Sequence, residues 1–180
     1  MRLFISIDFP DDILGEVRSW LPEQKGWKKV KNHQMHLTLA FLGDCSGQEK
    51  EEIHSVLSEI DFSPFKIAIS GLGAFPNESS PRIIWAGIEP TDPLMSLQEE
   101  ISERLQDFIK SKESHSYIPH ITLARKKSRK GINHVVKQNL KRKTTEIELF
   151  IDSFHLKESI LKSSGSEHHI LHTYQAKSNE

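Results

Sequence analysis

A six-residue pattern occurs twice in the sequence and constrains the fold more than any other feature. Residues 35–40 read Met-His-Leu-Thr-Leu-Ala, and residues 119–124 read Pro-His-Ile-Thr-Leu-Ala. In both copies histidine and threonine alternate with apolar residues, which is the period of a β-strand with one buried face. The repeat therefore predicts two similar halves, each of which contributes one such strand to a shared cleft.

The rest of the chain alternates between short strands and amphipathic helices. Helices are expected directly after Pro10, over 53–60, from Asp92 onward and over 132–140, and strands over 3–9, 35–43, 65–69, 82–88, 119–124, 145–156 and 170–174. No Gly/Ser-rich linker divides the chain, so residues 1–180 are expected to form one domain. The prediction is an α+β fold, a bilobal pseudo-two-fold arrangement of antiparallel sheets with flanking helices and a central cleft.

Charge is distributed unevenly along a chain whose net charge is only −1. Nine lysines and arginines and no acidic residue lie between Arg125 and Lys143, and a smaller basic cluster comprises Lys25, Lys28, Lys29 and Lys31. Each cluster lies near one His-x-Thr motif, which suits an anionic substrate such as a phosphate or a nucleic acid, although a solvated surface is the simpler reading of any one charge run.

Several classes of protein are not expected from the composition. No apolar run approaches the roughly 20 residues that span a bilayer, and the N-terminal segment lacks the features of a signal peptide. Cys45 is the one cysteine, so an internal disulfide is excluded. We expect a cytoplasmic protein without a membrane segment, and a monomer.

The two motifs suggest general acid–base chemistry on a phosphodiester. Alternation places His36 and Thr38 on one face of their strand, and it does the same for His120 and Thr122. With an unperturbed pKa of about 6.5, one imidazole can accept a proton while the other donates one. A single such motif would more often be structural, but two copies beside basic segments favour catalysis.

The remaining groups of this scheme would bind the phosphate. The hydroxyls of Thr38 and Thr122 can donate hydrogen bonds to its non-bridging oxygens, and Arg125 can add a forked contact. No metal ion and no cofactor is required for this reaction, so none is expected.

At these residues the sequence resembles the two-histidine (2H) phosphoesterases, and most closely their RNA 2′,3′-cyclic phosphodiesterases, also named 2′-5′ RNA ligases. The resemblance rests on residues 2–8, on 36–43 with the extension Phe-Leu-Gly, on 73–76 with 81–87, and on 119–125, which includes Arg125. The tail departs from the pattern, because His168 stands where a tyrosine often follows the glycine that corresponds to Gly165.

The resemblance implies hydrolysis of a 2′,3′-cyclic phosphate at an RNA end to leave a 2′-phosphate. It implies that His36 is the proton donor to the leaving 3′ oxygen and that His120 is the proton acceptor that activates water. It also implies a reverse reaction that forms 2′-5′ linkages. Two alternatives remain open: a 2H enzyme for another small cyclic phosphate or a 2′-5′ oligonucleotide, and an RNA-binding module without catalysis.

Other residues are predicted to be structural. His168, His169 and His172 could line a metal site on a helix, but the neighbouring residues favour a strand and a surface role. Trp85 and Phe41 could stack on a base, but core packing is the expectation for both.

Overall fold

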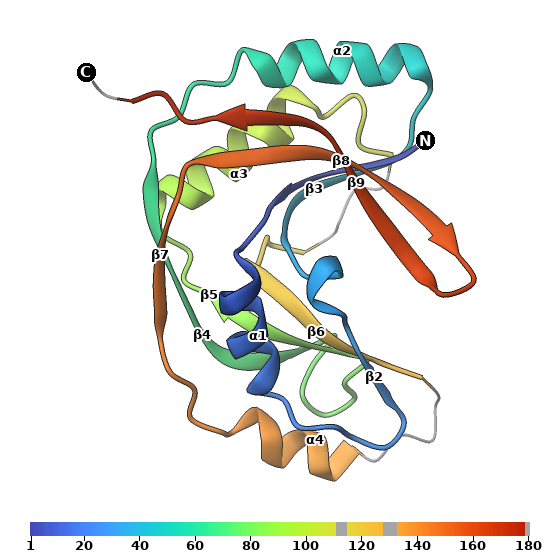
Figure 1. Ribbon diagram of the computed structural model, residues 1–180, viewed down its shortest axis with the longest axis vertical. Helices are drawn as coiled ribbons and strands as arrows, with labels where there is room; N and C mark the ends of the chain where they lie inside the picture. Colours follow the sequence, from blue (N-terminus) through green and yellow to red (C-terminus); the bar gives the residue numbers. More distant parts are fainter. Residues whose placement is uncertain (111–114, 128–132, 179–180) are drawn as a thin grey trace.

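The computed structural model describes residues 1–110, 115–127 and 133–178, and it has the predicted α+β composition (Figure 1). The helices are α1 (Asp11–Ser19), the short 3-10 helix η1 (Asn32–Gln34), α2 (Gly47–Ser58), α3 (Asp92–Arg104) and α4 (Asn133–Leu140). The strands are β1 (Arg2–Ile7), β2 (Trp27–Lys29), β3 (Leu37–Asp44), β4 (Phe65–Phe75), β5 (Ile83–Ile88), β6 (His120–Lys126), β7 (Ile147–Ile151), β8 (Ser153–Lys162) and β9 (Gly165–Gln175).

The strands form one antiparallel sheet, in which the spatial order of the strands differs from their order in the sequence. Its order is β7-β4-β5-β6-β3-β1-β8-β9, with β2 paired to β6. The antiparallel sheets of the two halves are continuous, because β3 and β6 join them where Leu37 pairs with Ile121. In Figure 1, α2 and α4 lie at opposite ends of the long axis, and the β8–β9 hairpin projects to one side.

Local sequence signals explain where the helices begin. The Ser46 hydroxyl accepts a hydrogen bond from the Glu49 backbone, and the Glu49 carboxylate accepts one from the Ser46 backbone, which is a capping box at the start of α2. Two acidic residues, Asp11 and Asp12, occupy the first turn of α1, where they complement the helix dipole. The apolar stripe of α3 is buried against the sheet at Leu94, Leu97 and Ile101.

The structure differs from the predicted strands in several places. Strands β4 and β9 extend beyond the predicted ranges 65–69 and 170–174. The strand predicted over residues 145–156 is divided at Asp152, because β7 pairs with β4 in one half of the sheet and β8 pairs with β1 in the other. The three-residue strand β2 was not predicted, since it is too short to show a period. Among the described helices, none is long and apolar enough to cross a membrane.

Candidate active site

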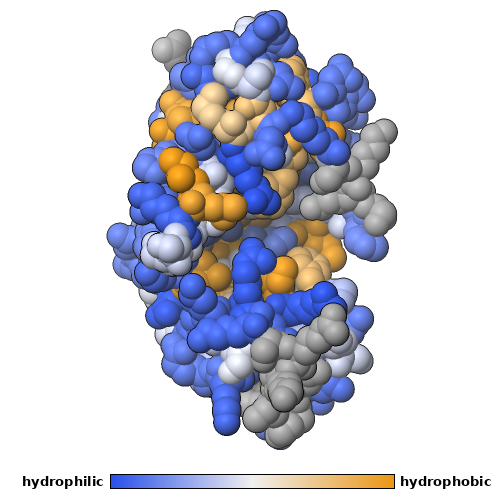
Figure 2. All heavy atoms as spheres, turned by 90° about the vertical axis from the view of Figure 1, so that its right-hand side faces the viewer, coloured by the Kyte–Doolittle hydropathy of each residue, from blue (hydrophilic) through white to orange (hydrophobic). Residues whose placement is uncertain are grey.

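The two His-x-Thr strands lie side by side at the centre of the sheet. Leu37 and Ile121, the residues that pair β3 with β6, are both fully buried. The neighbouring histidines and threonines lie on the opposite face of their strands and are partly exposed: His36, Thr38, His120 and Thr122. Apolar residues thus anchor each strand, as the alternation predicted, and the polar residues share one face. Figure 2 shows a hollow between the upper and lower halves of the molecule.

The Leu37–Ile121 pair indicates how the two motifs face each other. If the antiparallel register at Leu37 and Ile121 is extended by one residue each way, His36 lies opposite Thr122, and Thr38 lies opposite His120. The two histidines are then diagonal neighbours on one face, an arrangement in which long side chains reach each other in regular antiparallel sheet.

The orientation of His120 is fixed by its own strand and by an aromatic wall. Its Nδ1 lies 2.7 Å from the Ile118 carbonyl oxygen, which can only accept, so Nδ1 carries the proton and the neutral ring has its lone pair on Nε2. The ring meets Phe75 edge-on at 4.9 Å and lies 6.0 Å from Trp85, measured between ring centroids. Trp85 in turn covers Gly73, where a Cβ atom would come within 2.2 Å of the indole ring.

His36 lies in a more enclosed environment than a surface histidine. Its ring centroid is 5.0 Å from that of Phe4 and 5.0 Å from that of His168. Its Nδ1 is buried, and in the part of the chain that the structure describes no atom meets the distance and angle of a hydrogen bond to it. The backbone of Gln34, two residues earlier, nevertheless favours its charged form, just as Ile118 is two residues before His120.

Burial, followed by the nearby His168 and Lys157, lowers the pKa of His36 from 6.5 to about 3. Asp8 and the Gln34 backbone act in the opposite direction but do not compensate. His36 is therefore neutral at pH 7 in the ligand-free protein. An anion bound beside the ring would favour its charged form and raise the pKa.

A polar group next to His36 was not identified from the sequence. Lys157 of β8 is only 5% exposed and forms an ion pair with Asp8, which follows β1. The Ser6 hydroxyl donates to Asp8 Oδ1 at 3.3 Å, and His155 Nε2 lies 3.9 Å from Asp8 Oδ2. Ser6 pairs in register with Thr38 on one side and with His155 on the other. The polar alternation of Ser6 and Asp8 in the opening strand was the available signal.

The two basic clusters of the sequence meet beside the second motif. Strand β2 pairs with β6 so that Lys28 lies directly opposite Arg125, and both side chains are exposed. The Lys29 ammonium instead donates to the Leu21 carbonyl at 2.6 Å, and burial lowers its pKa. Two further basic residues of the longer cluster, Arg129 and Lys130, lie outside the described residues.

The expectation that Phe41 belongs to the core was wrong, because the residue is 52% exposed. The register of β1 and β3 shifts between Leu3 and Phe4, so that Phe41 pairs with Phe4 and its ring lies 5.9 Å from the Phe4 ring. Trp85 is not part of the buried core that was expected for it: it is partly buried and packs beside Phe75 and His120.

The three histidines near the C-terminus have three different environments. His168 packs on His36, His169 lies 3.5 Å from Glu167, and His172 stacks on His54 at 3.6 Å. Within the described residues there is no group of three or more His, Cys, Asp or Glu side chains that could hold a metal ion.

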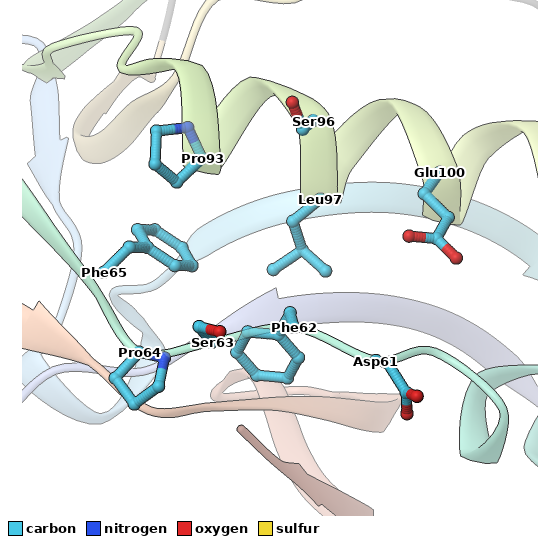
Figure 3. A pocket seen from close by; sticks show the side chains of 9 residues that line it. All are labelled: Asp61, Phe62, Ser63, Pro64, Phe65, Pro93, Ser96, Leu97 and Glu100. Carbon is cyan, nitrogen blue, oxygen red and sulfur yellow. The ribbon is translucent and has the colours of Figure 1, made fainter. Parts of the chain in front are cut away.

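A cavity of about 230 Å³ lies away from the motif strands, between α3 and the segment that precedes β4 (Figure 3). Leu97 points toward Phe62 across it, and Asp61 and Glu100 lie at one end. Its lining is mainly apolar and contains neither motif, so this cavity is separate from the candidate active site.

Comparison with known sequences identifies the family of the chain. A sequence model of the 2′-5′ RNA ligase superfamily matches residues 9–159. The chain is 34% identical to an RNA 2′,3′-cyclic phosphodiesterase of Archaeoglobus fulgidus, covering 92% of this chain and 94% of the relative. It is 31% identical to one of Thermotoga maritima, covering 97% and 95%.

Solved structures share the fold over nearly their whole length. The crystal structure of TT0787 of Thermus thermophilus has a TM-score of 0.78 and 27% identity, with 97% of each chain covered. The crystal structure of Escherichia coli LigT with 3′-AMP has a TM-score of 0.81 and 22% identity, with 98% of each chain covered.

Proposed function

The chain belongs to the 2′-5′ RNA ligase superfamily and is an enzyme of the phosphodiesterase class, and we propose that it opens 2′,3′-cyclic phosphate ends of RNA to leave a 2′-phosphate. The observation that carries the proposal is the pairing of β3 with β6, which brings two imidazoles and two hydroxyls to one face. The names of the relatives support RNA as the substrate.

In the proposed reaction, His120 is the general base. The Ile118 carbonyl holds the proton on Nδ1, so Nε2 can accept a proton from water as the water oxygen attacks phosphorus. A new P–O bond forms with water while the P–O3′ bond breaks. Displacement on phosphorus is in line, so the leaving oxygen departs from the side opposite the base.

His36 then donates a proton to the leaving 3′ oxygen. Because the ring is neutral in the ligand-free protein, it must take up this proton when the anionic substrate binds. The negative charge of the phosphate stabilises the imidazolium and offsets the effects of burial and Lys157. After turnover His120 is protonated and His36 is neutral, and exchange with solvent restores the starting state.

The other residues of the site bind the phosphate and the chain attached to it. Thr38 and Thr122 lie on the same face as the histidines and donate hydrogen bonds to the non-bridging oxygens as charge accumulates there. Arg125 and the adjacent Lys28 provide positive charge for the RNA backbone. The reverse reaction, joining of a cyclic phosphate to a 5′-hydroxyl, uses the same groups by microscopic reversibility, and water competes strongly in dilute substrate.

The test is phosphorus NMR of an oligonucleotide with a 2′,3′-cyclic phosphate end, incubated with the protein and EDTA. A 2′-phosphate product supports the proposal and the assigned roles. A 3′-phosphate product contradicts the assigned polarity of the two histidines. If the oligonucleotide is not turned over but a nucleoside cyclic phosphate or a 2′-5′ oligonucleotide is, RNA with a cyclic phosphate end is not the substrate. If the protein binds RNA but turns over none of these compounds, the enzymatic proposal is contradicted.

A further inference from the structure

The His36 ring contacts two other rings, those of Phe4 and of His168 in β9. The rings of His36 and His168 meet edge to face, at an interplanar angle of 75°, and His168 also meets Phe4 edge-on at 5.0 Å. The three rings therefore contact one another pairwise. An imidazole enclosed in this way has few rotamers available, so its reacting nitrogen keeps one direction.

A hydrogen bond between two distant segments supports this arrangement. The Gln34 side chain, at the end of η1, donates to the Ser166 carbonyl oxygen at 2.7 Å. Gln34 is two residues before His36, and Ser166 is two residues before His168. The same side chain lies close to Gly165, where a Cβ would come within 3.3 Å of the Gln34 amide nitrogen. The β8–β9 hairpin is thereby fixed where it presents His168 to His36.

One ring nitrogen of His168 forms no hydrogen bond within the described residues. Its Nδ1 is buried and, in the described part of the chain, has no hydrogen-bond partner. Burial is the largest effect on its pKa, which is lowered, and Lys157 acts in the same direction. His168 is therefore neutral near pH 7, where a charge beside His36 would oppose proton uptake.

The charged and titratable groups around the two rings come from every neighbouring element. They are Asp8 after β1, His33 of η1, Lys157 of β8 and His169 of β9. Asp8 favours the charged form of both rings, whereas Lys157 opposes it in both cases. Because Asp8 and Lys157 are paired with each other, His168 is the titratable group in ring contact with His36, and it becomes charged only when the solution is acidified below the ordinary range of histidine.

We propose that His168 is a positioning residue for His36: its neutral ring holds the His36 imidazole in place, and its protonation prevents His36 from taking up the proton that the reaction needs. The inference rests on the proposed role of His36 as proton donor. It predicts that activity falls on the acid side when His168 becomes charged, in addition to any loss caused by protonation of His120.

The experiment compares the wild type with H168F, H168A and the control H169Q. H168F keeps a ring but cannot become charged, and H168A removes both ring and charge. The control residue, His169, lies next to His168, but its side chain is 53% exposed and faces Glu167. The readouts are the pH profile of kcat/KM and the NMR signal of the His36 ring carbon proton in ligand-free protein.

We expect the acid-side fall of kcat/KM to move to lower pH in H168F and H168A but not in H169Q. In the wild type, the His36 signal should shift while His168 titrates, and this shift should be absent in H168F. The kcat of H168A should be about tenfold lower than that of H168F, with KM within about twofold, because the ring that orients His36 is lost.

Unchanged pH profiles in both variants at position 168, or an equal change in H169Q, would overturn the inference. The NMR readout needs no substrate, so it separates this result from a failure of the proposed function. If the His36 signal follows His168 but the wild type does not open a cyclic phosphate, the contact between the rings stands and the proposed reaction is what fails.

Discussion

The Leu37 and Ile121 backbones pair at the point where β3 meets β6, and both side chains are fully buried. This pair joins the two halves of the sheet, and its immediate neighbours on each strand are a histidine and a threonine. The position of the candidate active site is therefore determined by the sheet itself rather than by loops. Substitutions of the polar residues should consequently affect activity more than folding.

Replacement of either motif histidine by alanine tests the site directly. We expect H36A and H120A each to lose at least about 100-fold in kcat/KM, because each removes one of two proton-transfer steps. H169A, at an exposed histidine of β9, serves as the matched control and should retain full activity. Circular dichroism should show a folded protein in every case, and full activity of H36A or H120A would exclude the two-histidine mechanism.

The aromatic wall around His120 depends on the absence of a side chain at Gly73. In G73A the new methyl group would overlap the Trp85 ring, which must move from its place beside Phe75 and His120. We expect a loss of about 1–3 kcal/mol in unfolding free energy and a lower kcat. The control is G47A, where nothing lies within 4 Å of the added Cβ; equal stability and activity of the two variants would show that the wall is not required.

Alternation in the sequence was sufficient to predict the two motif strands and their buried and polar faces, because a strand has a fixed period of two. It was not sufficient for His168, since the residue reaches His36 only through the β8–β9 hairpin and the Gln34–Ser166 hydrogen bond. Such contacts depend on how distant segments pack. Phe41 was misassigned for a related reason, because a shift in register cannot be seen in the hydrophobic pattern of one strand.

The pairing of Asp8 with Lys157 leads to a prediction for both stability and activity. D8N leaves a nearly buried ammonium without its partner, which should cost about 1–3 kcal/mol in unfolding free energy, given that Asp8 itself is partly exposed. It also removes a group that favours the charged form of His36, so kcat/KM should fall. Urea unfolding and steady-state kinetics measure the two effects, and the exposed substitution D61N is the control.

The lowered pKa of His36 makes the stability of the protein depend on pH in a defined direction. Between pH 6.5 and about 3 the unfolded chain binds a proton at this residue that the folded protein does not, so stability decreases as the pH falls through that range. His155, His168 and His172 also have lowered pKa values and act in the same direction.

His36 contributes a slope of at most about 1.4 kcal/mol per pH unit. Urea unfolding at pH 7.5 and pH 5.0 should therefore show a less stable protein at pH 5.0, and H36N should show a smaller difference between the two conditions. The same unfolding free energy for the wild type at both values would contradict the burial of a neutral His36.

The adjacent basic side chains on β2 and β6 are expected to contact the RNA backbone. K28E places a negative charge directly opposite Arg125, so it should weaken RNA binding. The slope of log affinity against log salt concentration should become smaller in magnitude by about one for each phosphate contact that is lost. Turnover of a cyclic mononucleotide should fall less than turnover of RNA, since Lys28 is assigned to the RNA backbone and not to the reacting phosphate. K66E, on an exposed part of β4, is the control. Fluorescence anisotropy with a labelled oligonucleotide at several salt concentrations measures the slope, and identical slopes for the wild type and K28E would remove β2 from the RNA path.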